Sequence, residues 1–223
     1  MKPFDSSAKS YDSWYESRMG AFVDRVETEL AFSLFPHEKG MKVLDVGCGT
    51  GNQSIKLARK GVLVTGIDIS TKMLEIAKEK ARDEGLSVNF RFMDAEKLEF
   101  EDEFFDGAIS ITAFEFLPKP EKVLKEMFRV VKKGGSIVVG TINRDSSWGE
   151  MYMSEKYRQD SVFKYADLKS LEDMKKWYPE KLVTIRQSLF IPPNAPEEEI
   201  TPEREKELSE RTKGGFICAL WKK

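Results

Sequence analysis

The hydrophobic positions of this chain alternate between helical spacing and short apolar runs. Phe22, Val26, Leu30 and Leu34 recur at every fourth position, which predicts an amphipathic helix. Residues 42–46 form instead a compact apolar run of the kind found in a buried strand. Further strands are predicted over residues 62–69, 87–93, 105–112 and 136–142, and further helices after Gly51, from Ser70 and from Pro118.

The alternation of strands and helices predicts the fold class. Units of roughly thirty residues, each a strand followed by a helix, are typical of an α/β protein with a parallel sheet covered by helices on both faces. The last eighty or so residues are less regular. There we expect a helix around 167–177, a strand at 182–191, a charged helix within 197–213 and a terminal strand at 215–221, and this closing pair can add an antiparallel edge.

Charge and composition narrow the partners. The 36 basic and 38 acidic residues nearly cancel, and the formal net charge is -2, which argues against capture of nucleic acid or an anionic membrane. With Cys48, Cys218 and the single histidine His37, a disulfide framework and a Cys/His zinc cluster are excluded, and we expect no metal. The sequence shows no signal peptide or membrane span, so a cytoplasmic location is expected. Abundant charge with little Gln and Asn is typical of thermophiles.

A glycine-rich loop follows the first predicted strand. Glycines at positions 47, 49 and 51 allow a sharp turn and bring backbone N–H groups against a ligand without an intervening Cβ. The spacing is G-x-G-x-G, which differs from the dinucleotide fingerprint G-x-G-x-x-G and from the phosphate-binding P-loop. The loop therefore indicates a ligand site at the carboxyl edge of the sheet, with turn geometry alone as the competing explanation.

Two acidic residues lie at the ends of the next two strands. Asp68 follows the loop by about twenty residues, where an acid can accept hydrogen bonds from ribose hydroxyls. Ser70 is better placed than Asp68 to cap the following helix. Asp94 ends the third strand and can accept from an exocyclic amine such as that of adenine, or serve as a solvated turn residue. The order and spacing of these features together favour a nucleoside ligand.

These segments resemble the motifs of the class I S-adenosylmethionine-dependent methyltransferases, in their type-11-like, small-molecule branch. Residues 43–51, VLDVGCGTG, are similar to the first motif of that family, and GIDIS at 66–70 is similar to the second. FMDAE at 92–96 is similar to the adenine-binding motif, and FFDGAIS at 104–110 with LKEMFRVVKKGG at 124–135 matches later landmarks. The resemblance covers residues 38–142 closely and the remainder loosely.

The resemblance implies a Rossmann-like, doubly wound, mostly parallel sheet of seven strands with an antiparallel last strand. It implies S-adenosylmethionine (SAM) as methyl donor and S-adenosylhomocysteine (SAH) as product, with the glycines near the methionine part. Met73 lies near the adenine in such proteins, although it equally suits a helix core, and Cys48 suits a small packing position. The implied donor-binding residues are Tyr11, Trp14, Gly47, Cys48, Gly49, Gly51, Asp68, Ile69, Met73, Asp94, Ala95 and Ile111.

The resemblance also implies one domain over residues 1–223. Residues 1–36 would form an N-terminal lid and helix, 37–142 the donor-binding core, and 143–223 the acceptor-side elements with the last two strands. The segment YDSWYE at 11–16 resembles a lid, in which Tyr11, Trp14 or Tyr15 offers an aromatic face to the sulfonium; a packing role on the domain is the alternative. We expect residues 1–15 to become ordered over a bound ligand.

The acceptor is the least determined part of the sequence. Glu115, just past the fourth strand, is the best-placed ionisable residue to orient or deprotonate an acceptor, with a helix-start carboxylate as the alternative. Trp148 and Tyr152 fall where acceptor-pocket residues often lie in this family, or belong to the core. The motifs of nucleobase-amine and cytosine-C5 methyltransferases are missing, which favours a small molecule over nucleic acid.

Four other functions remain compatible with the sequence. A non-catalytic SAM-binding regulator fits the lack of an evident catalytic residue, and a methyltransferase acting on RNA or protein shares the donor motifs. An NAD-dependent oxidoreductase would need a different glycine spacing. An aminopropyltransferase would need an acidic cluster after the fourth strand that this chain lacks.

Overall fold

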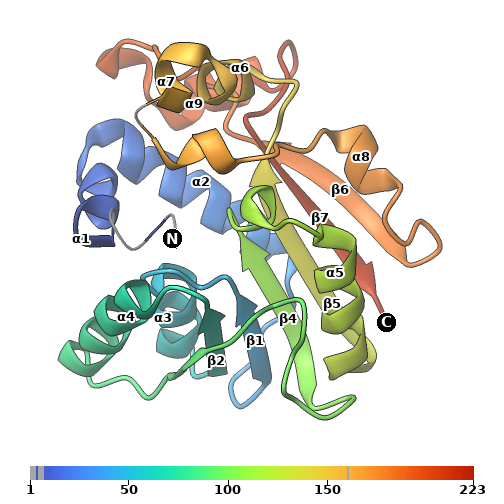
Figure 1. Ribbon diagram of the computed structural model, residues 1–223. Coiled ribbons are helices and arrows are strands. Elements are labelled where there is room, and N and C mark those ends of the chain that lie inside the picture. Colours follow the sequence, from blue (N-terminus) through green and yellow to red (C-terminus); the bar gives the residue numbers. More distant parts are fainter. Residues whose placement is uncertain (1–3, 5–7, 160) are drawn as a thin grey trace.

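The computed structural model describes residue 4, residues 8–159 and residues 161–223. Seven strands form one sheet in the order β3-β2-β1-β4-β5-β7-β6 (Figure 1). The strands are β1 (Lys42–Val46), β2 (Leu63–Asp68), β3 (Asn89–Phe92), β4 (Phe105–Ile111), β5 (Val131–Ile142), β6 (Leu182–Ser188) and β7 (Phe216–Lys222).

The sheet topology confirms the predicted fold class. Strands β1 to β5 pair in parallel, whereas β7 pairs antiparallel with both β5 and β6. From β1 the chain winds outward to β2 and β3 on one side and to β4 and β5 on the other. The strand order therefore reverses between β1 and β4, and the carboxyl ends of these two strands border the crevice in which such sheets bind ligands.

Helices cover both faces of the sheet and its carboxyl edge. In Figure 1, α6, α7 and α9 gather beyond the carboxyl end of β5. None of the helices in the described ranges has the length and apolar character needed to cross a membrane. The α-helices are α1 (Ala8–Tyr11), α2 (Arg18–Leu34), α3 (Asn52–Arg59), α4 (Thr71–Asp83), α5 (Pro120–Val130), α6 (Ser147–Met153), α7 (Glu155–Gln159), α8 (Leu171–Lys175) and α9 (Pro202–Leu208). Short 3₁₀ turns are η1 (Asp12–Glu16), η2 (Phe114–Phe116), η3 (Val162–Tyr165) and η4 (Glu197–Glu199).

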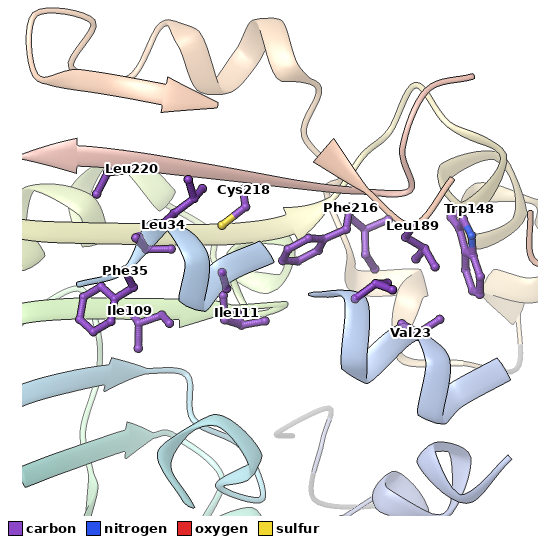
Figure 2. Packing of buried hydrophobic residues seen from close by; sticks show 14 of the residues in the cluster. Val23, Leu34, Phe35, Ile109, Ile111, Trp148, Leu189, Phe216, Cys218 and Leu220 are labelled. Carbon is purple, nitrogen blue, oxygen red and sulfur yellow. The ribbon is translucent and has the colours of Figure 1, made fainter. Parts of the chain in front are cut away.

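The core has two layers, one on each face of the sheet. Alternate residues of β7 point to opposite faces, so Cys218 packs with Leu34 of α2, while Trp221 packs in the layer that includes Met127 of α5. Figure 2 shows the first layer, in which Cys218 and Phe35 belong to the same cluster. Each such large apolar side chain stabilises the fold by about 1.5–3 kcal/mol through burial. This packing holds the carboxyl edge of the sheet in place.

The structure differs from the sequence prediction at several boundaries. The helix that we expected to include Val131 ends at Val130, because Val131 is already extended and pairs with Phe105. The strand expected to reach Ile191 ends at Ser188, since Leu189 takes a positive φ of 63°. The helix around 167–177 is confined to α8, where Ser170 and Asp173 form a capping box.

The sequence patterns also failed to predict helices in the N-terminal segment and after β5. Residues 8–16 showed no clear period, yet they form α1 and η1. Helices α6 and α7 were not predicted, although the Ser146 hydroxyl accepts from Gly149 N–H as an N-cap. Residues 1–3 and 5–7 of the predicted lid lie outside the described residues.

Candidate functional site

The glycine loop turns sharply at the end of β1. Gly47 and Gly49 have φ values of +71° and +52°, a region that L side chains rarely adopt. A Cβ on Gly47 would lie 2.5 Å from the Cβ of Ala113, so the approach of β1 to the segment after β4 requires glycine there. A Cβ on Gly49 would meet nothing within 4 Å. Gly49 therefore presents bare backbone to open space at the crevice.

Asp68 ties the end of β2 to this loop. Its Oδ2 accepts the N–H of Gly49 at 2.9 Å, and its Oδ1 accepts the N–H of Ser70 at 2.8 Å. A carboxylate offers about four lone-pair sites, so these bonds leave Asp68 able to share its oxygens with ligand hydroxyls. The predicted ribose acid thus lies beside the predicted donor loop, nineteen positions along the chain from Gly49.

A cavity opens between the glycine loop, the carboxyl end of β4, helix α2 and the N-terminal segment. Predicted residues that line it include Tyr11, Cys48 and Ile111, together with two of the three loop glycines. Its lining residues are Tyr11, Tyr15, Asp24, Glu27, Asp45, Gly47, Cys48, Gly49, Thr50, Asn52, Gln53, Ile111 and Thr112.

A latch of hydrogen bonds holds the N-terminal segment against the glycine loop. Asp12 Oδ1 accepts from Thr50 Oγ1 at 2.8 Å and from Asn52 Nδ2 at 3.0 Å, and Asp12 Oδ2 accepts from Lys80 Nζ at 2.8 Å. Partial burial alone would raise the pKa of Asp12, but the bonds from Lys80, Asn52 and Thr50 bring it below its ordinary value. We call these four residues the Asp12 latch. The sequence analysis missed it, because only the position of an acid among aromatic residues hints at it.

The aromatic residues of the N-terminal segment separate into inner and outer members. Tyr11 and Tyr15 line the cavity, with ring centroids 6.0 Å apart in an edge-to-face contact. Trp14 packs edge-to-face on Tyr15 but is 39% exposed and is not among the described residues that line this cavity. Of the three aromatic residues expected to face the donor, Tyr11 and Tyr15 line the cavity, whereas Trp14 packs outside its described lining.

Three buried carboxyl groups lie at or near the cavity, and sequence reasoning found only Glu115. Burial raises the pKa of Asp45 to about 6, although the Ser54 hydroxyl donates to it at 2.6 Å. Burial raises the pKa of Glu115 to about 7, against bonds that include the Thr141 hydroxyl at 3.0 Å. Burial also raises the pKa of Glu27 well above its ordinary value, and the nearby Glu115 adds to this effect.

The predicted donor-binding residues after β2, near β3 and on α4 differ in their exposure to solvent. Asp94 is exposed, and its Oδ1 accepts from Glu96 N–H at 2.8 Å, as a turn residue does. Ile69 is 48% exposed at the end of β2, where a ligand can cover it. Ala95 and Met73 are buried, so Met73 occupies a core position on α4.

Trp148 belongs to the core, whereas Thr112 lines the cavity. Trp148 donates from Nε1 to the carbonyl of Ile191 at 2.8 Å, which makes it part of the core. Thr112 was not singled out by the sequence, yet it lines the cavity with a φ of +50°. A β-branched residue in that region is strained, and such strain clusters at functional sites.

Comparison with known proteins agrees with this geometry. The family model described as "Methyltransferase domain" matches residues 37–208. An uncharacterized protein of Methanocaldococcus jannaschii, MJ1123, is 31% identical over 193 residues, covering 85% of this chain and 86% of its own. The phosphatidylethanolamine N-methyltransferase of Cereibacter sphaeroides is 38% identical over 139 residues, covering 60% of this chain and 67% of its own.

A solved structure matches nearly the whole chain. It is a SAM-dependent methyltransferase of Thermotoga maritima, described as a possible histamine N-methyltransferase. That protein is 28% identical, superimposes with a TM-score of 0.75, and the match covers 99% of this chain and 98% of the other. The sheet order, the glycine loop and these matches lead to one conclusion. The chain belongs to the class I methyltransferase family.

Proposed function

We propose that this protein transfers a methyl group from SAM to a small-molecule acceptor. The observation that carries the proposal is the contact between Gly49, in the loop after β1, and Asp68, at the end of β2, next to the point where the strand order reverses. A bare backbone loop bonded to an acid at the end of the second strand is the arrangement that a nucleoside donor needs. The family match and the SAM-dependent Thermotoga maritima relative support it.

The residues present fit the donor. The open space beside Gly49 is space that a side chain would fill, so the loop leaves room for a ligand. Asp68 would hold the ribose, Asp94 and Ile69 the adenine end, and Tyr11 would place an aromatic ring near the sulfonium. Asp45, a buried carboxyl group in the cavity lining at the end of β1, would meet the donor's ammonium group.

Methyl transfer from SAM needs no general acid. When bound, SAM supplies a methyl group to a nucleophile by in-line displacement and leaves as a neutral thioether. The protein's own residues therefore orient the acceptor and exclude water. We assign the second task to the Asp12 latch, because it holds against the glycine loop the segment that supplies Tyr11 and Tyr15 to the cavity lining.

Titration calorimetry with SAM, SAH and NAD tests the donor assignment. We expect SAM and SAH to bind one site and NAD to bind no more than weakly. Transfer of a labelled methyl group to a metabolite mixture then tests the activity. Absence of SAM and SAH binding would refute the proposal. Tight SAM binding without transfer to any metabolite pool would favour a non-catalytic SAM-binding protein.

A further inference from the structure

A second pair of acidic side chains comes from α2 and from the segment after β4: Glu27 lines the same cavity as the glycine loop, and Glu115 follows the cavity-lining Thr112. Glu27 of α2 is 7% exposed, and Glu115 of η2 is 1% exposed. Phe4 packs edge-to-face on Phe116 of η2 and on Tyr11 of the cavity lining, with ring centroids 4.8 Å and 6.4 Å apart, so η2 adjoins the cavity that Glu27 lines. Burial, and then the charge of Glu115, raise the pKa of Glu27. The two glutamates come from elements that are far apart in the sequence, and we call them the glutamate pair.

The glutamate pair lacks a cation of its own. In the part of the chain that the structure describes, neither glutamate forms an ion pair. Lys56 is engaged by Asp24 at 2.5 Å and Lys169 by Asp167. Glu115 Oε1 is buried and has no hydrogen-bond partner among the described atoms. A buried carboxylate oxygen without a partner costs folding free energy, so a ligand that supplies a donor and a positive charge would be bound strongly.

Phenol rings surround the same region. Tyr11 and Tyr15 line the cavity together with Glu27. Burial raises the pKa of Tyr11 to about 12, and the charges of Glu115 and Glu27 add to this effect. Tyr152 of α6 is buried and stacks on Phe163, with ring centroids 4.0 Å apart. Aromatic faces beside carboxylates form a site suited to an ammonium group.

The donor's own ammonium is the main competing occupant. Glu27 and Asp45 line the same cavity, but they come from different elements. On the loop side, Asp68 accepts the N–H of Gly49 and Asp45 accepts the Ser54 hydroxyl. Asp68 thus bonds directly to the donor loop, whereas in the described residues neither glutamate does, which leaves the glutamate pair for a second cation.

We infer that the acceptor is an amine, which enters as an ammonium ion and is held by Glu27 and Glu115 among Tyr11, Tyr15 and Tyr152. This inference rests on the proposed methyl transfer and names its substrate class. A neutral alcohol or thiol would leave the buried glutamates protonated, because burial raises their pKa values, whereas an ammonium ion stabilises their charged form. The glutamate pair therefore selects nitrogen over oxygen and sulfur acceptors.

The proton balance follows from this placement. The ammonium gives one proton to a carboxylate of the glutamate pair, and its nitrogen keeps the lone pair. That lone pair forms the N–C bond as the C–S bond breaks, and the breaking pair remains on sulfur. The product leaves as an N-methylammonium ion, and the carboxyl group then releases its proton to water. Glu115, with Oε1 unpartnered, is the proton acceptor that the geometry favours.

Binding measurements test the inference without turnover. The protein saturated with SAH is titrated with a library of primary amines, including histamine and ethanolamine, each beside the alcohol of the same skeleton. We expect amines to raise the melting temperature more than their alcohols do. No preference for any amine over its alcohol would overturn the inference, while SAH binding by itself would leave the proposed donor function standing.

Two glutamate variants test whether the preference for amines comes from the glutamate pair. Glu115→Gln and Glu27→Gln keep the side-chain volume and should weaken amine binding by about 10- to 100-fold, with SAH affinity within about twofold of wild type. Glu29→Gln on the exposed side of α2 and Glu121→Gln on α5 are matched controls that should change neither. Equal loss of amine and SAH affinity would assign the glutamate pair to the donor and contradict the inference. An unchanged amine preference in both variants would contradict it too.

Discussion

Two acidic regions of this protein differ in how the chain builds them. The loop region contains Asp45 and Asp68, and the backbone N–H groups of Gly49 and Ser70 both donate to Asp68. In the glutamate pair, Glu115 Oε2 accepts from the Thr141 hydroxyl, while its Oε1 has no partner among the described atoms, and Glu27 is buried on α2. Backbone N–H groups keep their position whichever ligand binds, whereas an unpartnered side-chain oxygen can turn to meet one. We therefore expect the loop region to be the more rigid of the two.

The largest effect is expected at Gly49. A valine there would project into the open space of the cavity and would strain a φ of +52°. Gly49→Val should lower SAM affinity by about 100-fold or more, since both the approach and the turn are lost. Gly40→Val is the matched control, because Gly40 has a φ of +86° and an equally open Cβ direction outside this cavity. Scanning calorimetry should find similar destabilisation in both variants, and titration calorimetry should find loss of SAM binding only in Gly49→Val. If Gly49→Val binds SAM as well as wild type, the loop does not contact the donor.

The next effect is expected at Asp68. Asp68→Ala removes a charged acceptor from paired hydroxyl donors and should weaken SAM binding by about 1–3 kcal/mol. Asp106→Ala is a suitable control, because Asp106 bonds Lys42 N–H and Lys132 at the opposite edge of the sheet. Titration calorimetry with SAM compares the affinities of the two variants. An Asp68→Ala protein that folds and binds SAM as well as wild type would remove the ribose assignment.

The sequence identified the loop region because its residues are local. Strands β1, β2 and β4 and the glycines between 47 and 51 are read from runs of neighbouring residues, and Asp68 follows at a short, regular interval. The boundaries failed where long-range pairing decides. Val131 continues a helical pattern but leaves the helix because Phe105 offers a strand partner.

The glutamate pair and the Asp12 latch could not be read in the same way. Glu27 lies on a helix whose period predicts an apolar face, and nothing local indicates that its carboxyl group is buried beside Glu115. Asp12 meets Lys80 across 68 positions of sequence, a contact that only the fold creates. Glu115 was found through its place after β4, while its burial and its unpartnered oxygen came from the structure.

A pH effect reports on the buried Glu115, with a pKa of about 7, at pH values above the pKa of about 6 of Asp45 in the loop region. Glu115 has an ordinary pKa of 4.5 and a pKa of about 7 in the folded protein, because burial disfavours its charge. Between these values the folded state keeps a proton that the unfolded chain releases, so stability falls as pH rises from about 4.5 to 7. Glu115→Gln should flatten that part of the profile and raise the melting temperature near pH 7 by roughly 2–4 °C. Thermal unfolding from pH 4.5 to 8 checks this. Parallel profiles for variant and wild type would show that Glu115 stays ionised.

The smallest effect is expected at the Asp12 latch. Asp12 and Lys80 keep side-chain exposures of 35% and 31%, so solvent screens their attraction. Asp12→Ala should cost about 0.5–1 kcal/mol of folding stability and should speed hydrogen exchange in residues 11–16. Asp83→Ala, an exposed acid on α4, is the control and should change neither. Unaltered exchange in residues 11–16 of the Asp12→Ala protein would mean that packing of Tyr11 and Tyr15 holds the segment.

Hydrogen exchange with and without SAH reports on both regions in one experiment, and it shows whether the loop and Asp68 hold the donor. With SAH alone, we expect slower exchange in residues 47–52, in residues 68–70 and in the N-terminal segment 11–16, while the central strands change little. Adding a bound amine should extend protection to residues 112–116 and to α2 around Glu27. Unchanged exchange in residues 47–52 and 68–70 at saturating SAH would show that the loop and Asp68 do not hold the donor.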